Sequence, residues 1–82
     1  MSTDRLRRFY ARTARDGRFL ASRIRLDDLA AALGVDETMA CRVGLCTLPG
    51  ERDREMWLDR VSERFGIDRD RLEHVLARIG AS

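Results

Sequence analysis

Apolar residues recur every three to four positions along most of this chain, which is the spacing of one face of an α-helix. No segment alternates apolar and polar residues as a half-buried strand does. One proline and six glycines interrupt the pattern, so we expect short turns between helices. The pattern predicts an all-α fold with five helices, forming a single helical domain over residues 1–82.

The first predicted helix begins at Ser2 or Thr3, either of which can serve as its N-cap, and it ends at Gly17. Its apolar face is formed by Leu6, Phe9, Tyr10 and Thr13, and its other face by Arg5, Arg8, Arg12 and Arg15. We expect the apolar face to dock on the core, because a core this small cannot spare it for a membrane surface. In the next segment, residues 18–25, we expect Phe19, Leu20 and Ile24 to be buried, in either a short helix or a tight connection.

The clearest pattern is a helix-turn-helix unit at about residues 26–45. Its first helix carries an apolar stripe that consists of Leu26, Leu29, Ala30 and Leu33. Gly34 can adopt the left-handed conformation that ends a helix, and Asp36 occupies an N-cap position for a second helix that runs to about Gly44. Ala40 and Val43 would face the first helix. Two helices joined by a short turn with a glycine are typical of this arrangement.

A loop with Pro49-Gly50 is expected from Leu45 to Arg54. A fourth helix follows from about Glu51 or Asp53 to Gly66, and its predicted buried residues are Trp57, Leu58, Val61 and Phe65. Asp68 then caps a last helix that ends at Gly80, with Leu72, Val75, Leu76 and Ile79 buried.

The stretch LDDLAAALGVDETMACRVGLC, Leu26 to Cys46, resembles the second and third helices of lambda-repressor-like (Xre/Cro-type) DNA-binding domains. The matching features are the Leu29-Ala30 pair, the Leu-Gly-Val turn, the cap at Asp36 and the Arg42-Val43 pair. The later segment WLDRVSERFGIDRDRLEHVL is similar to the closing helices of that family, so the resemblance covers roughly residues 22–77. It implies a lambda-repressor-like fold, a role in transcription regulation and duplex DNA as the ligand.

In that family the second helix of the unit presents polar side chains to the major groove. Arg42 can address guanine here, and Thr38 can contact a phosphate or a thymine methyl group. Glu37 would repel the DNA backbone, and Met39 and Cys41 offer little to a base edge. The chain has no asparagine or glutamine for a bidentate contact to adenine, and Leu26 stands where the family often has a phosphate-binding glutamine.

The charge is uneven along the chain. Residues 1–25 hold eight arginines and two acidic residues, whereas residues 26–82 hold eight arginines and twelve acidic residues. The basic end predicts a polyanion-binding surface. The residues expected to contact DNA are Thr38, Met39, Arg42, Arg23 and Arg25, and such domains commonly bind as homodimers.

A second hypothesis is a protein-protein interaction module that keeps the helix-turn-helix fold without sequence-specific DNA binding. It rests on one apolar cluster, formed by Met39, Cys41, Leu45, Cys46 and Leu48. If several of these side chains are exposed, they form a partner-docking patch. The alternative is that the loop residues among them fold back as a lid on the core.

Other function classes find little support in the sequence. No serine, cysteine or histidine has an identifiable catalytic partner, so we do not expect an enzyme or a cofactor. The two cysteines and the single His74 do not form a metal-binding pattern, and we expect reduced thiols. The longest apolar run has about five residues, Leu29 to Leu33, far fewer than a membrane span requires. We therefore expect a cytoplasmic location and no membrane partner.

Overall fold

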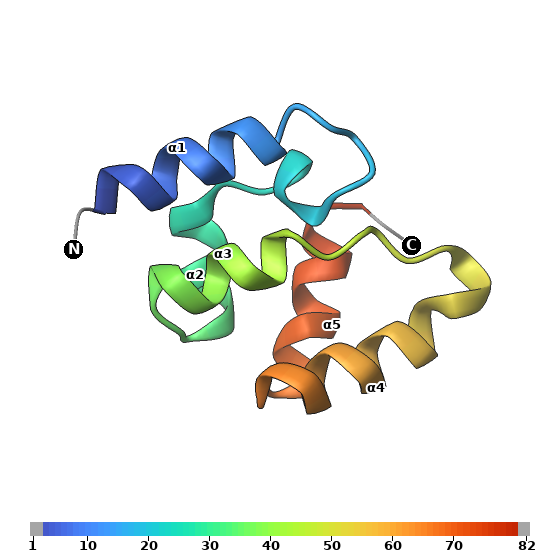
Figure 1. Ribbon diagram of the computed structural model, residues 1–82. Helices are drawn as coiled ribbons and strands as arrows, with labels where there is room; N and C mark the ends of the chain where they lie inside the picture. Colours follow the sequence, from blue (N-terminus) through green and yellow to red (C-terminus); the bar gives the residue numbers. More distant parts are fainter. Residues whose placement is uncertain (1–2, 81–82) are drawn as a thin grey trace.

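The computed structural model describes residues 3–80 and contains five α-helices within them (Figure 1). The helices are α1 (Thr3–Thr13), α2 (Leu26–Leu33), α3 (Glu37–Gly44), α4 (Arg54–Phe65) and α5 (Arg69–Arg78). Two short 3-10 helices, η1 (Leu20–Ser22) and η2 (Glu51–Asp53), lie in the connections. No strand occurs in residues 3–80, so the prediction of an all-α fold with five helices is confirmed.

The predicted helix-turn-helix unit is present as α2, a turn over residues 34–36, and α3. Gly34 ends α2 with a φ of 67°, a conformation that favours glycine. The Asp36 carboxylate caps α3 by accepting a 2.8 Å hydrogen bond from the backbone N–H of Met39. Ala40 and Val43 are completely buried against the core, as the apolar spacing predicts.

Helices α4 and α5 also begin and end near the predicted residues. Gly66 ends α4 in the left-handed conformation, and Asp68 caps α5 by accepting from the N–H of Asp70. Leu58, Val61, Leu72, Val75 and Leu76 are buried as predicted. Trp57 and Phe65 are only partly buried, contrary to expectation, because they lie on the flank of α4 that faces a surface groove.

Helix α1 is shorter than predicted, since it ends at Thr13 and not at Gly17. The predicted N-caps of α1 were Ser2 and Thr3. Ser2 and the side chain of Thr3 lie outside the described residues. Tyr10 is buried at 5% exposure, but the neighbouring Phe9 is 50% exposed. Consecutive residues point about 100° apart on a helix, so α1 can turn only one of these two rings fully into the core.

Residues 18–25 combine both of the conformations that the sequence left open. The short helix η1 is followed by a tight turn at Arg23, and an extended Arg25 leads into α2. The backbone at Arg18 and Leu20 pairs with the chain after α3, through bonds from Leu20 N–H to Cys46 O (2.9 Å) and from Leu48 N–H to Arg18 O (2.8 Å). Leu20 and Ile24 are buried as predicted, whereas Phe19 is only partly buried.

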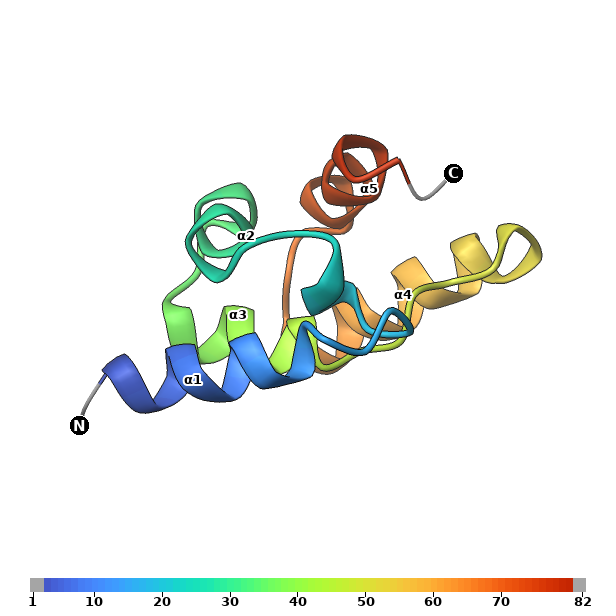
Figure 2. The ribbon, with the colours of Figure 1, turned by 90° about the horizontal axis from the view of Figure 1, so that it is seen from above.

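The helices pack around one shared core, with the most extensive contact between α2 and α3. Helix α1 packs on α3, and α5 packs on α2 and α4. Figure 2 shows that α1 lies along one side of the molecule and α5 along the opposite side. The side of the molecule that carries α1 and α3 therefore presents a surface remote from α5.

Candidate nucleic-acid interface

Helix α3 keeps one open face. Thr38, Arg42 and Leu45 are exposed and follow one another at intervals of four and three residues, so they lie in one stripe along α3 and its C-cap. Two of the other positions expected to face outward do not do so. Cys41 is 4% exposed, and this burial raises the pKa of its thiol. Met39 is partly buried and packs against the core at the edge of the stripe.

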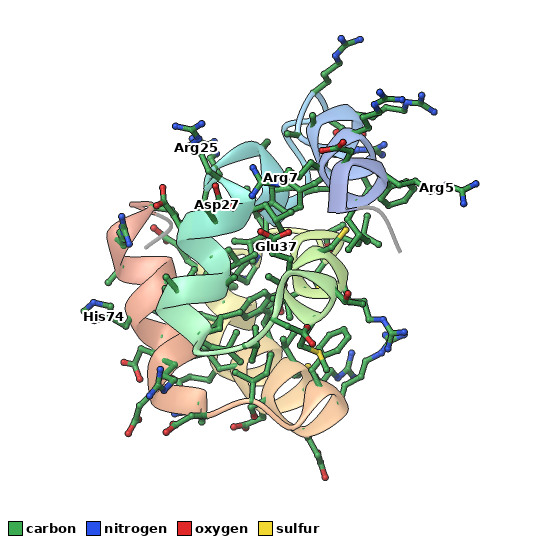
Figure 3. The ribbon with its side chains drawn as sticks, turned by 90° about the vertical axis from the view of Figure 1, so that its left-hand side faces the viewer. Arg5, Arg7, Arg25, Asp27, Glu37 and His74 are labelled. Carbon is green, nitrogen blue, oxygen red and sulfur yellow. The ribbon has the colours of Figure 1, made fainter. Side chains whose placement is uncertain are left out.

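The acidic residues at the start of α3 are held away from this stripe. The Asp36 carboxylate caps α3 by accepting a hydrogen bond from the Met39 N–H. Arg7 Nη2 donates to Glu37 Oε1 and also to Asp27 Oδ1, both at 3.1 Å, and Figure 3 shows Arg7 pointing into this junction. The Glu37 side chain is 27% exposed, and its second oxygen is buried. The sequence position of Glu37 predicted that it would repel a DNA backbone. In the structure its carboxylate is instead paired with Arg7.

Helix α1 lies closely along one side of α3. The Tyr10 ring packs against Gly44 so tightly that a β-carbon on this glycine would lie 2.5 Å from Cε2 of the ring. The Tyr10 hydroxyl donates a 2.6 Å hydrogen bond to the buried carbonyl oxygen of Ile24. Burial, and secondarily Cys41, raise the pKa of this hydroxyl well above its ordinary value. These contacts fix the position of α1 relative to α3.

The packing of Tyr10 determines where the arginines of α1 point. Arg7 faces α2, so Arg5 and Phe9, which lie on the other flank of the helix, project beside the open face of α3. In Figure 3, Arg5 points out to the side of α1 opposite to Arg7. Arg5, Arg8, Arg12 and Arg15 are all exposed, as predicted for this helix.

Helix α4 borders α3 on its other side, across a groove of about 1020 Å³. Three arginines line the groove, namely Arg42 of α3 and Arg60 and Arg64 of α4. Apolar lining residues include Leu45, Leu48, Met56, Trp57 and Phe65. We define this feature as the α3–α4 groove.

The charges of α4 are sorted between its two sides. Glu55 and Asp59 both pair with Arg69 of α5, which donates from Nε to Asp59 Oδ1 at 2.8 Å and from Nη2 to Glu55 Oε2. Arg60 and Arg64 line the α3–α4 groove instead. Two acidic side chains of α4 thus face α5, whereas two of its arginines line the groove beside α3.

Arg23 and Arg25 lie elsewhere. They line a separate hollow between α1 and the start of α2, together with Arg7. Figure 3 shows Arg25 on the opposite side of the molecule from Arg5. The structure therefore does not bring Arg23 and Arg25 together with Thr38 and Arg42, because the connection into α2 runs on the other flank of α1.

The apolar cluster predicted as a partner-docking patch is divided by the fold. Leu45 is 38% exposed, whereas Cys46 and Leu48 are partly buried in the α3–α4 groove, and Cys41 is inside the core. Sequence reasoning missed Met56, which is 54% exposed and adds to the apolar lining. It also missed Arg60 and Arg64, whose spacing of one helical turn was the available signal.

Neither the known protein families, nor the curated proteins, nor the solved structures contain a match to this chain. Within residues 3–80, no helix combines the length and the apolar character needed to span a bilayer. The same residues contain no group of three or more histidine, cysteine or acidic side chains placed to bind a metal ion. In this part of the chain both cysteines are free thiols.

Proposed function

We propose that this domain binds duplex DNA as a small transcriptional regulator, with α3 placed in the major groove. The observation that carries the proposal is the exposed Arg42 at the centre of the open face of α3, between arginines of α1 and α4, with Glu37 paired to Arg7 and Asp36 engaged as the helix cap. The resemblance of residues 26–46 to lambda-repressor-like domains points in the same direction.

The dimensions and chemistry of α3 suit this role. An α-helix with its side chains is about 10–12 Å across and therefore fits the major groove, which is about 12 Å wide, and the eight residues of α3 form about two turns. Arg42 can donate two hydrogen bonds to the edge of a guanine, and Leu45 can contact a thymine methyl group. Thr38 lies a turn earlier, where its hydroxyl can donate to a phosphate oxygen.

The flanking arginines supply contacts that do not depend on sequence. Arg5 and Arg12 on α1 and Arg60 and Arg64 on α4 border the two sides of α3, where the two DNA backbones pass. One domain of this size covers a single half-site, so recognition of a full operator requires a second copy of the chain. Binding as a homodimer is accordingly part of the proposal.

The experiment compares Arg42→Ala with Arg78→Ala on a duplex selected by the wild-type domain from a random pool. Arg78 is an exposed arginine of α5, a helix that lies on the opposite side of the molecule from α1 (Figure 2), and its substitution removes the same charge. Loss of a bidentate base contact costs about 1–3 kcal/mol, or about 5- to 150-fold in affinity for the selected site. Arg78→Ala should change affinity less than about twofold. Equal losses for the two variants would refute readout by α3.

A second experiment tests the role assigned to Arg7. Arg7→Gln should weaken DNA binding because it frees the negative charge of Glu37 beside α3. The double variant Arg7→Gln/Glu37→Gln should regain most of that loss, since the freed charge is then absent. Glu37→Gln alone is the reference, because the loss caused by Arg7→Gln should nearly vanish in that background if Arg7 acts by holding Glu37, whereas a phosphate contact by Arg7 would be lost equally in both backgrounds. Thermal unfolding of each variant shows whether the fold is retained.

A further inference from the structure

The α3–α4 groove includes apolar lining residues, Met56 and Trp57, to which the proposed DNA complex assigns no contact. Leu45 is 38% exposed and Met56 54% exposed, and both line the groove next to the half-buried Trp57. Charged phosphates gain little from packing on such side chains, whereas the apolar residues of another protein bury them well. Because the lining is apolar, we expect a ligand of this groove to have apolar side chains that pack on it.

The charges around the groove specify a second property of that ligand. Arg42, Arg60 and Arg64 line it, and among the described lining residues the one acidic side chain is Asp53. The carboxylates of the neighbouring region, Glu55 and Asp59, are held on the other side of α4 by Arg69. A protein that occupies the groove would therefore bring carboxylates to these guanidinium groups as well as apolar residues to the groove lining.

A single-stranded nucleic acid fits the groove less well than a protein does. Such strands bind mainly by stacking bases on open aromatic faces. The Phe65 ring is covered by the Arg64 guanidinium, whose Cζ lies 5.6 Å from the ring centroid. Trp57 is tied to the loop, because its Nε1–H donates a 2.9 Å hydrogen bond to Thr47 O. Both rings are also partly buried, so neither presents a fully open face to a base.

The shape of the α4 side of the groove favours a helical partner. Its lining residues Met56, Trp57, Arg60 and Arg64 follow one another at helical spacings, which form ridges that accept the ridges of a second helix. Helix α4 has 12 residues and is about 18 Å long, enough for about three turns of a partner. Arg60 and Arg64 are one turn apart, so they match acidic residues spaced by three or four positions on that partner.

We propose that the α3–α4 groove binds an acidic amphipathic helix of a partner protein, whose apolar stripe packs on Leu45 and Met56 and whose carboxylates pair with Arg60 and Arg64. The proposal does not rest on DNA binding, but it shares Leu45, Arg60 and Arg64 with the proposed DNA surface, so the two ligands would compete for the groove. It replaces the patch inferred from sequence, since Cys41 is buried and Met56, Arg60 and Arg64 take the main roles.

The test is a selection from a displayed library of helical 14-residue peptides without tryptophan, with the variant Arg60→Glu/Arg64→Glu used for counter-selection. We expect enriched peptides to carry acidic residues three or four positions apart beside an apolar stripe. Trp57 is the only tryptophan of the chain, so its fluorescence reports directly on occupation of the groove by a synthesised peptide.

Four variants then assign the contacts. Met56→Ser and Arg60→Glu should each weaken binding of the selected peptide at least tenfold, and Arg78→Glu should change it less than twofold. A peptide with its acidic residues replaced by lysine should bind Arg60→Glu/Arg64→Glu better than it binds the wild type. Circular dichroism checks that each variant keeps its helical content.

Three results would overturn the proposal. The first is enrichment of peptides without acidic residues, or affinity that is indifferent to Arg60→Glu. The second is an oligothymidine 12-mer that binds with the same dependence on Met56. The third is self-association of the wild-type domain that Met56→Ser abolishes, which would show that a second copy of the chain occupies the groove.

Discussion

The packing of α1 on α3 depends on Tyr10, and the substitution Tyr10→Phe tests that dependence. The change keeps the ring against Gly44 and removes only the hydroxyl, which donates a 2.6 Å hydrogen bond to the buried Ile24 carbonyl oxygen. A buried hydrogen bond contributes about 0.5–1.5 kcal/mol, and leaving its acceptor unpaired costs about 1–3 kcal/mol. We expect the free energy of unfolding to fall by about 1.5 kcal/mol.

For a domain of this size, 1.5 kcal/mol corresponds to a decrease of roughly 6–12 °C in the melting temperature. Urea and thermal unfolding followed by circular dichroism measure both quantities. The matched control is Thr13→Val on the same helix, whose hydroxyl donates to the Phe9 carbonyl oxygen at 3.0 Å in an exposed position. The control should change stability by less than about 0.5 kcal/mol. A Tyr10→Phe protein as stable as the control would refute the role given to this hydrogen bond.

Three further changes test other parts of the fold by the same unfolding measurements. Gly44→Ala places a β-carbon against the Tyr10 ring and should destabilise the domain by about 1–3 kcal/mol, so a neutral result would contradict the close packing of α1 on α3. Asp36→Ala removes the cap of α3 and should cost about 1 kcal/mol, with a cost near zero arguing against that cap. The hydrogen bonds from Arg18 lower the pKa of Asp16 from 3.8 to about 2, so this pair stabilises the domain above about pH 4 and the stabilisation is lost as the pH falls toward 2. The stability difference between the wild type and Asp16→Asn should therefore shrink between pH 5 and pH 2.5, and a constant difference would exclude the pair as its source.

Local signals in the sequence predicted most of the fold. Gly34 and Gly66 end helices because their left-handed conformation is a property of glycine itself. Asp36 and Asp68 start helices because a short acidic side chain reaches the N–H groups of the next turn. Each of these features depends on only a few neighbouring residues, so the sequence alone suffices to place it.

Features that depend on how helices face one another were harder to predict. Phe9 and Tyr10 are adjacent aromatic residues, and only the packing of α1 on Gly44 decides which of them is buried. Similarly, Trp57 and Phe65 fit the apolar pattern of α4, but they lie at its flank beside the α3–α4 groove. Sequence spacing shows which residues share a helix face, but not where the edge of that face meets solvent.

The candidate interface also combines features that the local sequence predicts with features that depend on how the helices pack. Arg42 and Thr38 could be placed on an exposed helix face from the pattern of α3 alone. The ion pair between Arg7 and Glu37 joins residues 30 positions apart, and no local rule predicts it. The gathering of Arg60 and Arg64 with Arg42, and the separation of all three from Arg25, likewise follow from tertiary packing.

The most direct test of the central claim is the binding of the wild-type domain to duplex DNA at two salt concentrations. Binding through four or five arginines gives a slope of log affinity against log salt of roughly −4. The affinity should then fall roughly 200-fold between 50 and 200 mM salt. The absence of binding at 50 mM salt with micromolar protein, or binding that salt does not weaken, would contradict the proposal that α3 and its flanking arginines form a DNA-binding surface.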